Sequence, residues 1–356
     1  MKTLHFDARF IRIDRHDGIS RFSSELAKAL SKKVHLVAII YDLRQLEFLP
    51  TSIEYVVVNN PQSPREFGIA KKLNRLGATH VFSPMQLMGS TGRKYKLILT
   101  LHDLIYYRHR KPPQSMNLLV RIIWRLYHLS YQPQRWLLNR ADAVATVSNT
   151  TKLLMEKHRL TSKPITVVYN APDKVQGVTK TAPESKNLIY IGSFMPYKNV
   201  ETLVRGAGLL PEHTLHLLSK ISKDRKSSLE KLASSANASV VFHDGVTDQE
   251  YRNLLRTAFA LVSASKDEGF GIPLVEAMQI GTPVVVSDLD IFSEVAGKAG
   301  TFFNPESPEA FANAISSLED SREWASKASQ SISQAAKFDW DKSADALLAA
   351  FRNLDS

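Results

Sequence analysis

The chain has 356 residues, of which 44% are hydrophobic and 23% charged, and it contains no cysteine. This length predicts about two domains with substantial cores. The lack of cysteine excludes disulfide bonds and thiolate metal sites and is typical of a cytosolic protein. No apolar run approaches the ~20 residues of a membrane span, and no signal peptide precedes the first predicted strand. We therefore expect a protein without a transmembrane segment.

Positive charge is concentrated in the first half of the chain. Up to Asn170 there are 27 Lys and Arg residues against 11 Asp and Glu, whereas the remainder has 19 against 24. This asymmetry predicts that the first half faces an anionic partner. The change coincides with residues 171–186, which are rich in Pro, Lys, Ser and Thr and are typical of a linker. We predict domains over 1–172 and 185–339, a linker over 173–184, and a C-terminal helix over 340–356 that packs back on the first domain.

Strands and helices alternate along both halves. In the first half a strand over 3–6 precedes a helix from Gly18 to about Leu30, and further strands are predicted over 34–40, 80–82, 97–101 and 144–147. In the second half the predicted strands cover 188–192, 215–218, 240–243, 258–264 and 284–287. This alternation predicts an α/β fold with a doubly wound, mostly parallel sheet in each domain. Polar loops follow the strand ends where open sheets bind ligands, so we expect the active site between the two sheets.

The most informative stretch, residues 265–278, lies between two apolar runs that are typical of buried parallel strands. Pro273 suits the start of a helix, and Gly281 suits the left-handed position after its end. The pattern therefore predicts a strand, a glycine loop, a short helix and a second strand.

Chemically, this loop combines a seat for phosphate with two carboxylates. Gly269 and Gly271 let an anion approach main-chain N–H groups at a helix N-terminus. Glu268 and Glu276 would repel a phosphate but suit the hydroxyls of a sugar or ribose. The arrangement predicts a nucleotide-sugar site.

The run E-G-F-G-I-P-x-x-E-A-M, followed by G-T-P-V-V-V-S-D, resembles the signature of the retaining family-4 glycosyltransferases. That family has two facing Rossmann-like domains, the GT-B architecture. The resemblance implies that Glu268 contacts the donor sugar, that Glu276 contacts the ribose, and that the amides of Gly269, Phe270 and Gly271 hold the diphosphate. An ordinary βαβ unit with a glycine-rich turn is the alternative, and it would account for a lone G-x-G better than for the whole motif.

A second motif leads from a strand through Gly192 to Lys198, six residues later. It resembles the family's diphosphate loop, in which the lysine binds the donor phosphates. Many relatives carry Arg directly after the glycine, where this chain has Ser193, and a hydroxyl cannot replace a guanidinium fork. The second phosphate contact is therefore open. Lys220 is a candidate for it, although an exposed surface lysine is the simpler interpretation.

Three further elements match the family. Gly18, in Asp17-Gly18-Ile19-Ser20, resembles the N-terminal glycine loop over donor and acceptor. His102, at a strand end in the first half, resembles the family's catalytic H-D pair, with a structural histidine as the alternative. Val246 lies in a loop that matches the one contacting the base. The resemblance thus implies His102, Glu268 and Lys198 as catalytic, with Gly18, Ser193, Val246 and Glu276 among the donor-binding residues.

Two apparent metal signals carry less weight. Asp288 and Asp290 form a D-x-D, but they follow a strand where relatives carry a loop without metal. His213 and His216 are spaced three apart, and we predict them to lie on the surface. We expect neither a metal nor another cofactor.

The stretch between Arg108 and Arg140 interleaves basic residues with aromatic ones. The aromatic residues include Trp124, Tyr127 and Trp136. Such a mixture suits an anionic membrane surface. A solvated helix with inward-facing aromatics is the competing interpretation, and we do not expect nucleic acid as a partner.

The resemblance implies a retaining, metal-independent glycosyltransferase that moves a hexose from a nucleotide-diphosphate sugar to a glycan or lipid-linked acceptor in envelope or polysaccharide biosynthesis. Mannose from GDP-mannose is the first choice, by analogy with bacterial mannosyltransferases. We expect it in the cytoplasm, at the inner face of the cell membrane. The alternatives are a UDP-sugar donor on the same fold, or an inactive GT-B scaffold that binds membrane or nucleic acid.

Overall fold

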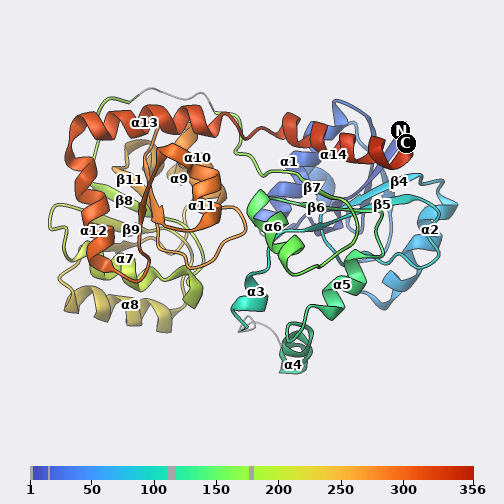
Figure 1. The fold of residues 1–356 in the computed structure, drawn as a ribbon, viewed down its shortest axis with the longest axis horizontal. Helices are drawn as coiled ribbons and strands as arrows, with labels where there is room; N and C mark the ends of the chain where they lie inside the picture. Colours follow the sequence, from blue (N-terminus) through green and yellow to red (C-terminus); the bar gives the residue numbers. More distant parts are fainter. Residues whose placement is uncertain (1–2, 15–16, 111–117, 176–179) are drawn as a thin grey trace. The chain divides into compact units, whose positions relative to one another are not determined.

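The computed structural model describes residues 3–14, 17–110, 118–175 and 180–356. The chain divides into two compact units (Figure 1). Unit 1 comprises Met1–Asn170 and Asp339–Ser356, and unit 2 comprises Ala171–Phe338. In this division the predicted linker belongs to unit 2, and residues 176–179 within it lie outside the described residues.

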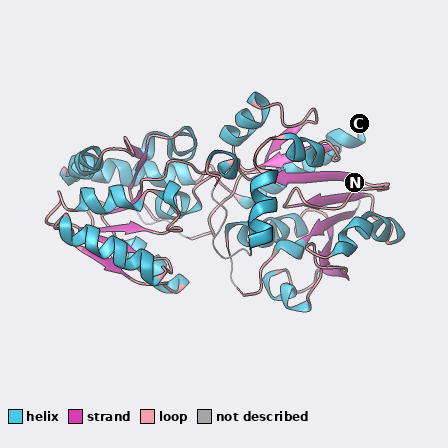
Figure 2. Cartoon of the chain, turned by 90° about the horizontal axis from the view of Figure 1, so that it is seen from below, coloured by secondary structure: helices cyan, strands magenta, loops and turns pink. Residues whose placement is uncertain are grey.

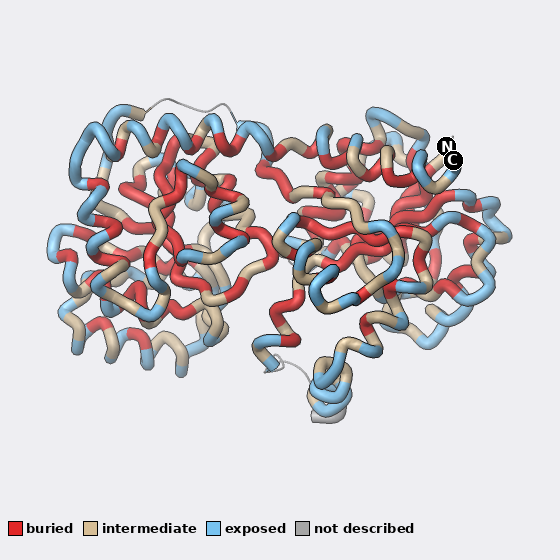
Figure 3. The backbone as a smooth tube through the Cα atoms, in the orientation of Figure 1, coloured by how far each residue is buried: buried red, intermediate tan, exposed pale blue. Residues whose placement is uncertain are grey.

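Unit 1 contains a parallel sheet that has seven strands among the described residues. The strands are β1 (Thr3–Asp7), β2 (His35–Ile40), β3 (Glu54–Val57), β4 (His80–Ser83), β5 (Lys96–Leu101), β6 (Ala143–Thr146) and β7 (Ile165–Val167). Their spatial order is β3-β2-β1-β4-β5-β6-β7, and every paired neighbour is parallel. The inner strands are apolar and buried along most of their length (Figure 3), as expected for a sheet covered on both faces.

Most helices of unit 1 connect these strands, and several of them lie beside the sheet (Figure 2). They are α1 (Gly18–Ser31), α2 (Ile69–Arg75), α3 (Ile105–Arg108), α4 (Leu118–Tyr127), α5 (Gln132–Leu138), α6 (Asn149–Lys157) and α14 (Trp340–Asp355), with the 3-10 helices η1 (Ala8–Phe10), η2 (Leu43–Phe48) and η3 (Pro64–Gly68).

The C-terminal helix α14 packs against α1 in unit 1. The ring of Trp340 lies 5.9 Å from that of Phe22, edge to face. Ser343 Oγ donates a hydrogen bond to the carbonyl oxygen of Tyr169 at 2.7 Å. An aromatic contact and a buried hydrogen bond therefore fix the last helix to the N-terminal sheet unit.

Unit 2 contains a second parallel sheet, with six strands in the described part of the chain. These are β8 (Asn187–Tyr190), β9 (Thr214–Leu217), β10 (Val240–Phe242), β11 (Ala260–Ser263), β12 (Val284–Ser287) and β13 (Gly300–Phe303), in the order β10-β9-β8-β11-β12-β13. Its helices are α7 (Val200–Ala207), α8 (Lys223–Ser235), α9 (Asp248–Thr257), α10 (Ile272–Gln279), α11 (Asp290–Ala296), α12 (Pro308–Ser316) and α13 (Ser321–Ala335), with η4 (Pro196–Lys198), η5 (Gly297–Ala299) and η6 (Ser317–Glu319).

The predicted α/β class with mostly parallel sheets is confirmed, and each predicted strand is present within a few residues. Three strands were not predicted: β3, β7 and β13. All three are edge strands of their sheets. Because an edge strand buries only part of its surface, its apolar pattern is weaker than that of a central strand.

The prediction that His213 and His216 lie on the surface is wrong. His213 is only 3% exposed, packs edge-on against Phe259 with ring centres 4.8 Å apart, and has its Nε2 3.0 Å from Glu319 Oε1. His216 is half-buried on β9, and its Nδ1 lies 2.9 Å from Nε2 of His243, which directly follows the neighbouring strand β10. Both histidines found partners far away in the sequence, which a local pattern does not reveal.

Candidate active site

Both sheets reverse their direction of winding next to the first strand of the unit. In unit 2 this switch point lies between β8 and β11, which are hydrogen-bonded neighbours although about 70 residues separate them. The loops that follow such a pair of strands diverge and leave a crevice at their carboxyl ends, where ligands bind in open α/β sheets. The two sequence motifs of the second half are these two loops.

The loop after β8 is fixed by hydrogen bonds that leave Lys198 near its end. Tyr190 Oη donates to the carbonyl oxygen of Ser193 at 2.6 Å, and the Gly192 amide donates to Ser219 Oγ at 3.0 Å. Asn199 closes the loop in the left-handed region, with φ of 51°, and its side chain donates to the carbonyl oxygen of Pro305 at 2.7 Å. Ser193 is exposed, and its hydroxyl stands where the family resemblance would place a guanidinium.

The loop after β11 meets this first loop directly. The Lys266 amide donates to the carbonyl oxygen of Tyr197 at 2.7 Å. Next to this backbone contact, Lys198 Nζ and Glu268 Oε1 form an ion pair, and each side chain is only 15% exposed. Buried Ser265 donates from Oγ to the same carboxylate oxygen at 3.0 Å. The structure thus brings together two residues that the sequence analysis had placed on separate motifs.

Gly271 begins the helix that follows, α10. It is the N-cap with φ of 93°, a conformation that favours glycine, and no side-chain hydrogen bond caps the helix there among the described residues. A Cβ at this position would meet the Phe292 ring at 3.1 Å, so both conformation and space select glycine. Gly269 is buried, and Phe270 packs edge-on against Phe338 with ring centres 5.4 Å apart. An aromatic contact therefore helps to fix the backbone of the loop that we predict to bind phosphate.

Glu276 lies one turn inside α10. Its Oε2 accepts a hydrogen bond from the hydroxyl of Tyr251 on α9 at 2.8 Å. Neither Tyr251 nor Ser265 was predicted from the sequence, because each acts only by orienting a carboxylate: Tyr251 bonds to Glu276, 25 residues away, and Ser265 bonds to Glu268. The only feature of the local sequence that indicates a role for Ser265 is its position, three residues before the glutamate of the motif.

Val246 lies half-buried in the loop after β10. The two preceding residues, Asp244 and Gly245, both have positive φ, at 54° and 107°. The Gly245 amide donates to the carbonyl oxygen of Leu218, which fixes this loop beside the one after β9. Lys220 in that neighbouring loop is exposed, and its aliphatic stem lies against Gly245.

In unit 1, His102 directly follows β5. Its Nε2 lies 2.8 Å from the carbonyl oxygen of Pro84, and its ring packs edge-on against Phe22 at 5.0 Å. Only an N–H can bond to a carbonyl, so Nε2 carries the proton and Nδ1 is left as an acceptor. Burial lowers the pKa of His102 to about 4, which keeps the imidazole neutral at physiological pH.

Gly18, the other predicted residue of unit 1, is the first residue of α1 and is exposed. Asp17 caps the helix by accepting from the Ser20 amide at 3.0 Å, and its other oxygen lies 3.2 Å from Arg12 Nη1. The N-terminus of α1 therefore begins with a capped turn and a glycine without a side chain to obstruct an approaching group.

The described residues contain neither a cluster of metal ligands nor a membrane-spanning helix. No group of three or more His, Cys, Asp or Glu residues there is placed to hold a metal ion. Asp288 and Asp290 are both exposed, in the loop after β12 and at the start of α11. No helix in the described ranges is both long and apolar enough to cross a bilayer.

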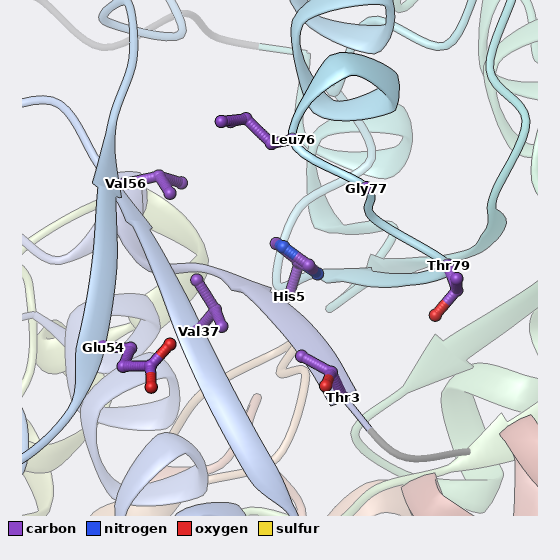
Figure 4. A pocket seen from close by; sticks show the side chains of 8 residues that line it. All are labelled: Thr3, His5, Val37, Glu54, Val56, Leu76, Gly77 and Thr79. Carbon is purple, nitrogen blue, oxygen red and sulfur yellow. The ribbon is translucent and has the colours of Figure 1, made fainter.

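A hollow of about 410 Å³ lies beside β1, β2 and β3 of unit 1, and none of the predicted site residues lines it (Figure 4). It is lined by Thr3, His5, Val37, Glu54, Val56, Leu76, Gly77 and Thr79. Burial lowers the pKa of His5, so this histidine is neutral and adds no charge to the hollow.

Comparison with known proteins identifies the class of protein that this fold and site define. Residues 173–354 match the family described as glycosyl transferases group 1, and residues 16–174 match Glycosyltransferase Family 4. The first match covers more than half of the chain, so the chain belongs to the group 1 glycosyltransferases, with the family-4 type of N-terminal domain and the GT-B fold. The resemblance inferred from the motifs is confirmed.

Among curated proteins, the chain is 32% identical over 183 residues to the O-antigen chain mannosyltransferase RfbU of Salmonella typhimurium, covering 51% of this chain and 52% of that protein. It is 30% identical over 173 residues to an Escherichia coli O-antigen chain mannosyltransferase B, covering 47% and 45%. The matched part thus spans about half the length of these relatives.

Among solved structures, sucrose-phosphate synthase from Thermosynechococcus elongatus superposes with a TM-score of 0.76 at 18% identity, covering 99% of both chains. The Anabaena protein HepE, in complex with UDP and glucose, gives 0.71 at 18% identity, covering 99% of this chain and 100% of that one. At these identities the likeness establishes the fold.

Proposed function

We propose that the protein is a retaining hexosyltransferase that takes mannose from GDP-mannose and adds it to a glycan or lipid-linked acceptor in envelope polysaccharide biosynthesis. The observation that carries the proposal is the meeting of Lys198, Glu268 and the α10 N-terminus at the switch point of unit 2, with Glu276 one turn further on. The similarity to O-antigen mannosyltransferases supports the choice of mannose and of a polysaccharide acceptor.

Each predicted residue takes one role in this proposal. The diphosphate is held by Lys198, by the backbone of Gly269–Gly271 and by the loop that contains Ser193. These groups stabilise the negative charge that grows on the diphosphate as the glycosidic bond breaks. Glu268 accepts hydrogen bonds from the sugar, Glu276 from the ribose, and the Val246 loop contacts the base. Gly18 gives the donor and acceptor room at the start of α1.

His102 acts on the sugar as a neutral hydrogen-bond acceptor. Its Nε2 proton is committed to Pro84, so Nδ1 can accept from a sugar hydroxyl. The acceptor hydroxyl attacks the anomeric carbon on the face that the diphosphate leaves, and its proton passes to the departing phosphate oxygen. The configuration is retained, and no covalent enzyme intermediate forms.

Isothermal titration with GDP, UDP and ADP tests the donor. We expect GDP to bind and the other two to bind at least tenfold more weakly. A preference for UDP would instead support a UDP-sugar donor, an alternative favoured by the binding of UDP in the HepE structure. Binding of none of the three would contradict the proposal and favour an inactive scaffold.

We further propose that the reaction needs no metal ion, because Lys198 and the amides at a helix N-terminus can neutralise the diphosphate. Transfer of radiolabelled mannose should therefore be unchanged in EDTA. Loss of turnover on chelation, restored by Mg²⁺ or Mn²⁺, would contradict this and return attention to Asp288 and Asp290.

Finally, we propose that unit 1 docks on an anionic membrane, at its cytoplasmic face, through α4. Trp124 packs inward, with its ring 4.1 Å from His128 and 5.1 Å from Tyr106. Aliphatic residues of the described part of the helix instead face outward, with exposed fractions of 47% for Ile122, 58% for Ile123 and 61% for Leu126. Leu129, two residues after the helix, is 58% exposed.

This outward aliphatic face is flanked by positive charge. Arg121 and Arg125 lie one turn apart on the same helix, and Trp136 on α5 is 62% exposed, with Arg140 stacked on it at 4.3 Å. Apolar side chains beside arginines suit the boundary between acyl chains and anionic headgroups. Lys111, also in the basic stretch, lies outside the described residues.

Liposome co-sedimentation separates the contribution of the arginines to membrane binding from that of the aliphatic side chains. Arg121→Glu/Arg125→Glu should abolish the preference for anionic vesicles at low salt, and Ile123→Ser/Leu126→Ser should weaken binding at any salt concentration. Leu153→Ser is the matched control, because this leucine is 64% exposed on α6. Equal pelleting of the wild type on neutral and anionic vesicles would contradict the proposal.

A further inference from the structure

Lys198 and Glu268 are two charged side chains of the proposed donor site, and they form an ion pair with each other. Under the proposed function, the lysine binds the diphosphate and the carboxylate binds the sugar. A donor must therefore take both partners out of an existing ion pair, and the effect of this exchange depends on whether the ligand carries a sugar.

The pair is held in place by its surroundings. Ser265 Oγ, which is buried, donates to Glu268 Oε1 at 3.0 Å and lies 3.1 Å from Ser263 Oγ. The backbone bond from Lys266 to Tyr197 fixes the two loops to each other. With each charged side chain only 15% exposed, solvent screens the pair weakly, and a carboxylate that lost its cation there would be left poorly solvated.

We propose that this ion pair makes the donor site select nucleotide sugars over the sugarless nucleoside diphosphate, and so promotes release of the product. This inference rests on the proposed function. A nucleoside diphosphate draws Lys198 to its phosphates and leaves Glu268 unpaired beside a second negative group. A nucleotide sugar also draws Lys198, but its hydroxyls donate to Glu268 and replace the lost partner.

The same exchange gives the reaction a direction. Once the sugar has moved to the acceptor, Glu268 loses its hydroxyl donors while still facing the diphosphate. It then competes for Lys198, and re-forming the pair weakens the hold on the product. Glu268 is therefore a specificity determinant that acts against one ligand as well as in favour of the other.

The test compares Glu268→Gln with the wild type by isothermal titration, using GDP and GDP-mannose, and UDP and UDP-glucose. The amide keeps the shape of the side chain and can bond to sugar hydroxyls, but it no longer attracts Lys198 or repels phosphate. We expect the nucleoside diphosphate to bind about 5- to 50-fold more tightly to the variant, and the nucleotide sugar not to gain affinity, so that the ratio of the two constants falls. The inhibition constant of the product should fall in parallel.

Glu306→Gln is the matched control. Glu306 forms an ion pair with Lys266 at 2.7 Å, next to the same loop, but its side chain is 68% exposed. Removing this solvated carboxylate should leave both affinities unchanged. Glu268→Asp is a second variant, because shortening the carboxylate withdraws it from Lys198 and should change the ratio in the same direction.

The outcomes distinguish this inference from the proposed function. If the wild type binds neither nucleoside diphosphates nor nucleotide sugars, the proposed function fails. If the wild type transfers sugar, but Glu268→Gln and Glu268→Asp bind the nucleoside diphosphate no more tightly than the wild type does, the exchange mechanism is wrong and the transferase function stands.

Discussion

The two units share a sheet topology but differ in how firmly the positively charged side chain after the first strand is bound. In unit 1, Arg9 follows β1 and is only 2% exposed; it forms two hydrogen bonds to Asp7 and two to Glu66. In unit 2, Lys198 follows β8 and forms one ion pair with a carboxylate that remains partly exposed. The first cation holds its loop through several bonds, whereas we propose that the second exchanges its single carboxylate for a ligand.

The difference extends to the other site residues. Unit 1 offers a neutral His102, and its positive charge lies on helices such as α4 that also expose aliphatic side chains. Unit 2 has Lys198 and Glu268 in the two loops at its switch point and Glu276 on α10. One topology thus carries a pair of charged side chains at the switch point of unit 2, and a neutral histidine with a basic surface in unit 1. The following experiments test this division, from the largest expected effect to the smallest.

Replacing His102 with Ala should lower turnover by about 10²–10⁴-fold, because a positioned polar group at the reacting sugar is lost. Nucleotide affinity should stay near that of the wild type, since we place the nucleotide in unit 2. Steady-state kinetics and titration with GDP measure the two effects. His80→Gln is the control, because His80 is paired with Asp355 within unit 1 and has no proposed role in the reaction. Full activity of His102→Ala would reduce this residue to a structural histidine.

Lys198→Ala should lower turnover by about 10²–10³-fold, as for loss of one group that stabilises developing charge. The free energy of unfolding should change less than the activation barrier does, because Glu268 stays partly exposed and keeps its hydrogen bond from Ser265. Single-turnover kinetics at saturating donor give the rate, and thermal unfolding gives the stability. Lys266→Ala, which removes a neighbouring lysine of a surface pair, is the control. Near-wild-type turnover would contradict the leaving-group role.

Glu276→Ala should weaken binding of the nucleoside diphosphate by roughly 1.5–3 kcal/mol, the value of hydrogen bonds to a charged group. The loss should be the same with and without a sugar attached, unlike that of Glu268. Tyr251→Phe should have a smaller effect in the same direction, because it removes only the hydroxyl that orients the carboxylate. Titration with GDP measures both, and an unchanged affinity for Glu276→Ala would exclude the ribose contact.

The stability of unit 1 should depend on pH through His102. Below the ordinary histidine pKa of about 6.5 the unfolded chain takes up a proton, whereas burial lowers the pKa of folded His102 to about 4. The folded state is therefore destabilised progressively as pH falls from 6.5 to 4, by roughly 2 kcal/mol at pH 5. His102→Gln, which can still donate to Pro84, should lose less stability over this range. Denaturant unfolding at pH 7 and pH 5 gives the difference, and equal losses in the two proteins would show that His102 is not the group responsible.

Local sequence determined much of the fold of this protein. Continuous apolar runs predicted the central strands, since a parallel strand covered on both faces must be apolar along its length. The spacing of Glu268, Gly271 and Glu276 predicted a loop that leads into a helix, because glycine and proline restrict the backbone at fixed positions. The edge strands β3, β7 and β13 were missed, since an exposed edge does not require that pattern.

Only the tertiary structure decided which side chains meet. Lys198 and Glu268 are paired because β8 and β11 are neighbours in the sheet, although about 70 residues separate them in the chain. Pro84 sets the proton position on His102 from another strand end. In α4, packing turned the aromatic Trp124 inward and left Ile123 and Leu126 exposed. Sequence periodicity sets which residues share a face of a strand or helix, but the partners of each face are contributed by distant segments, and those partners fix the charge, protonation and exposure of the site.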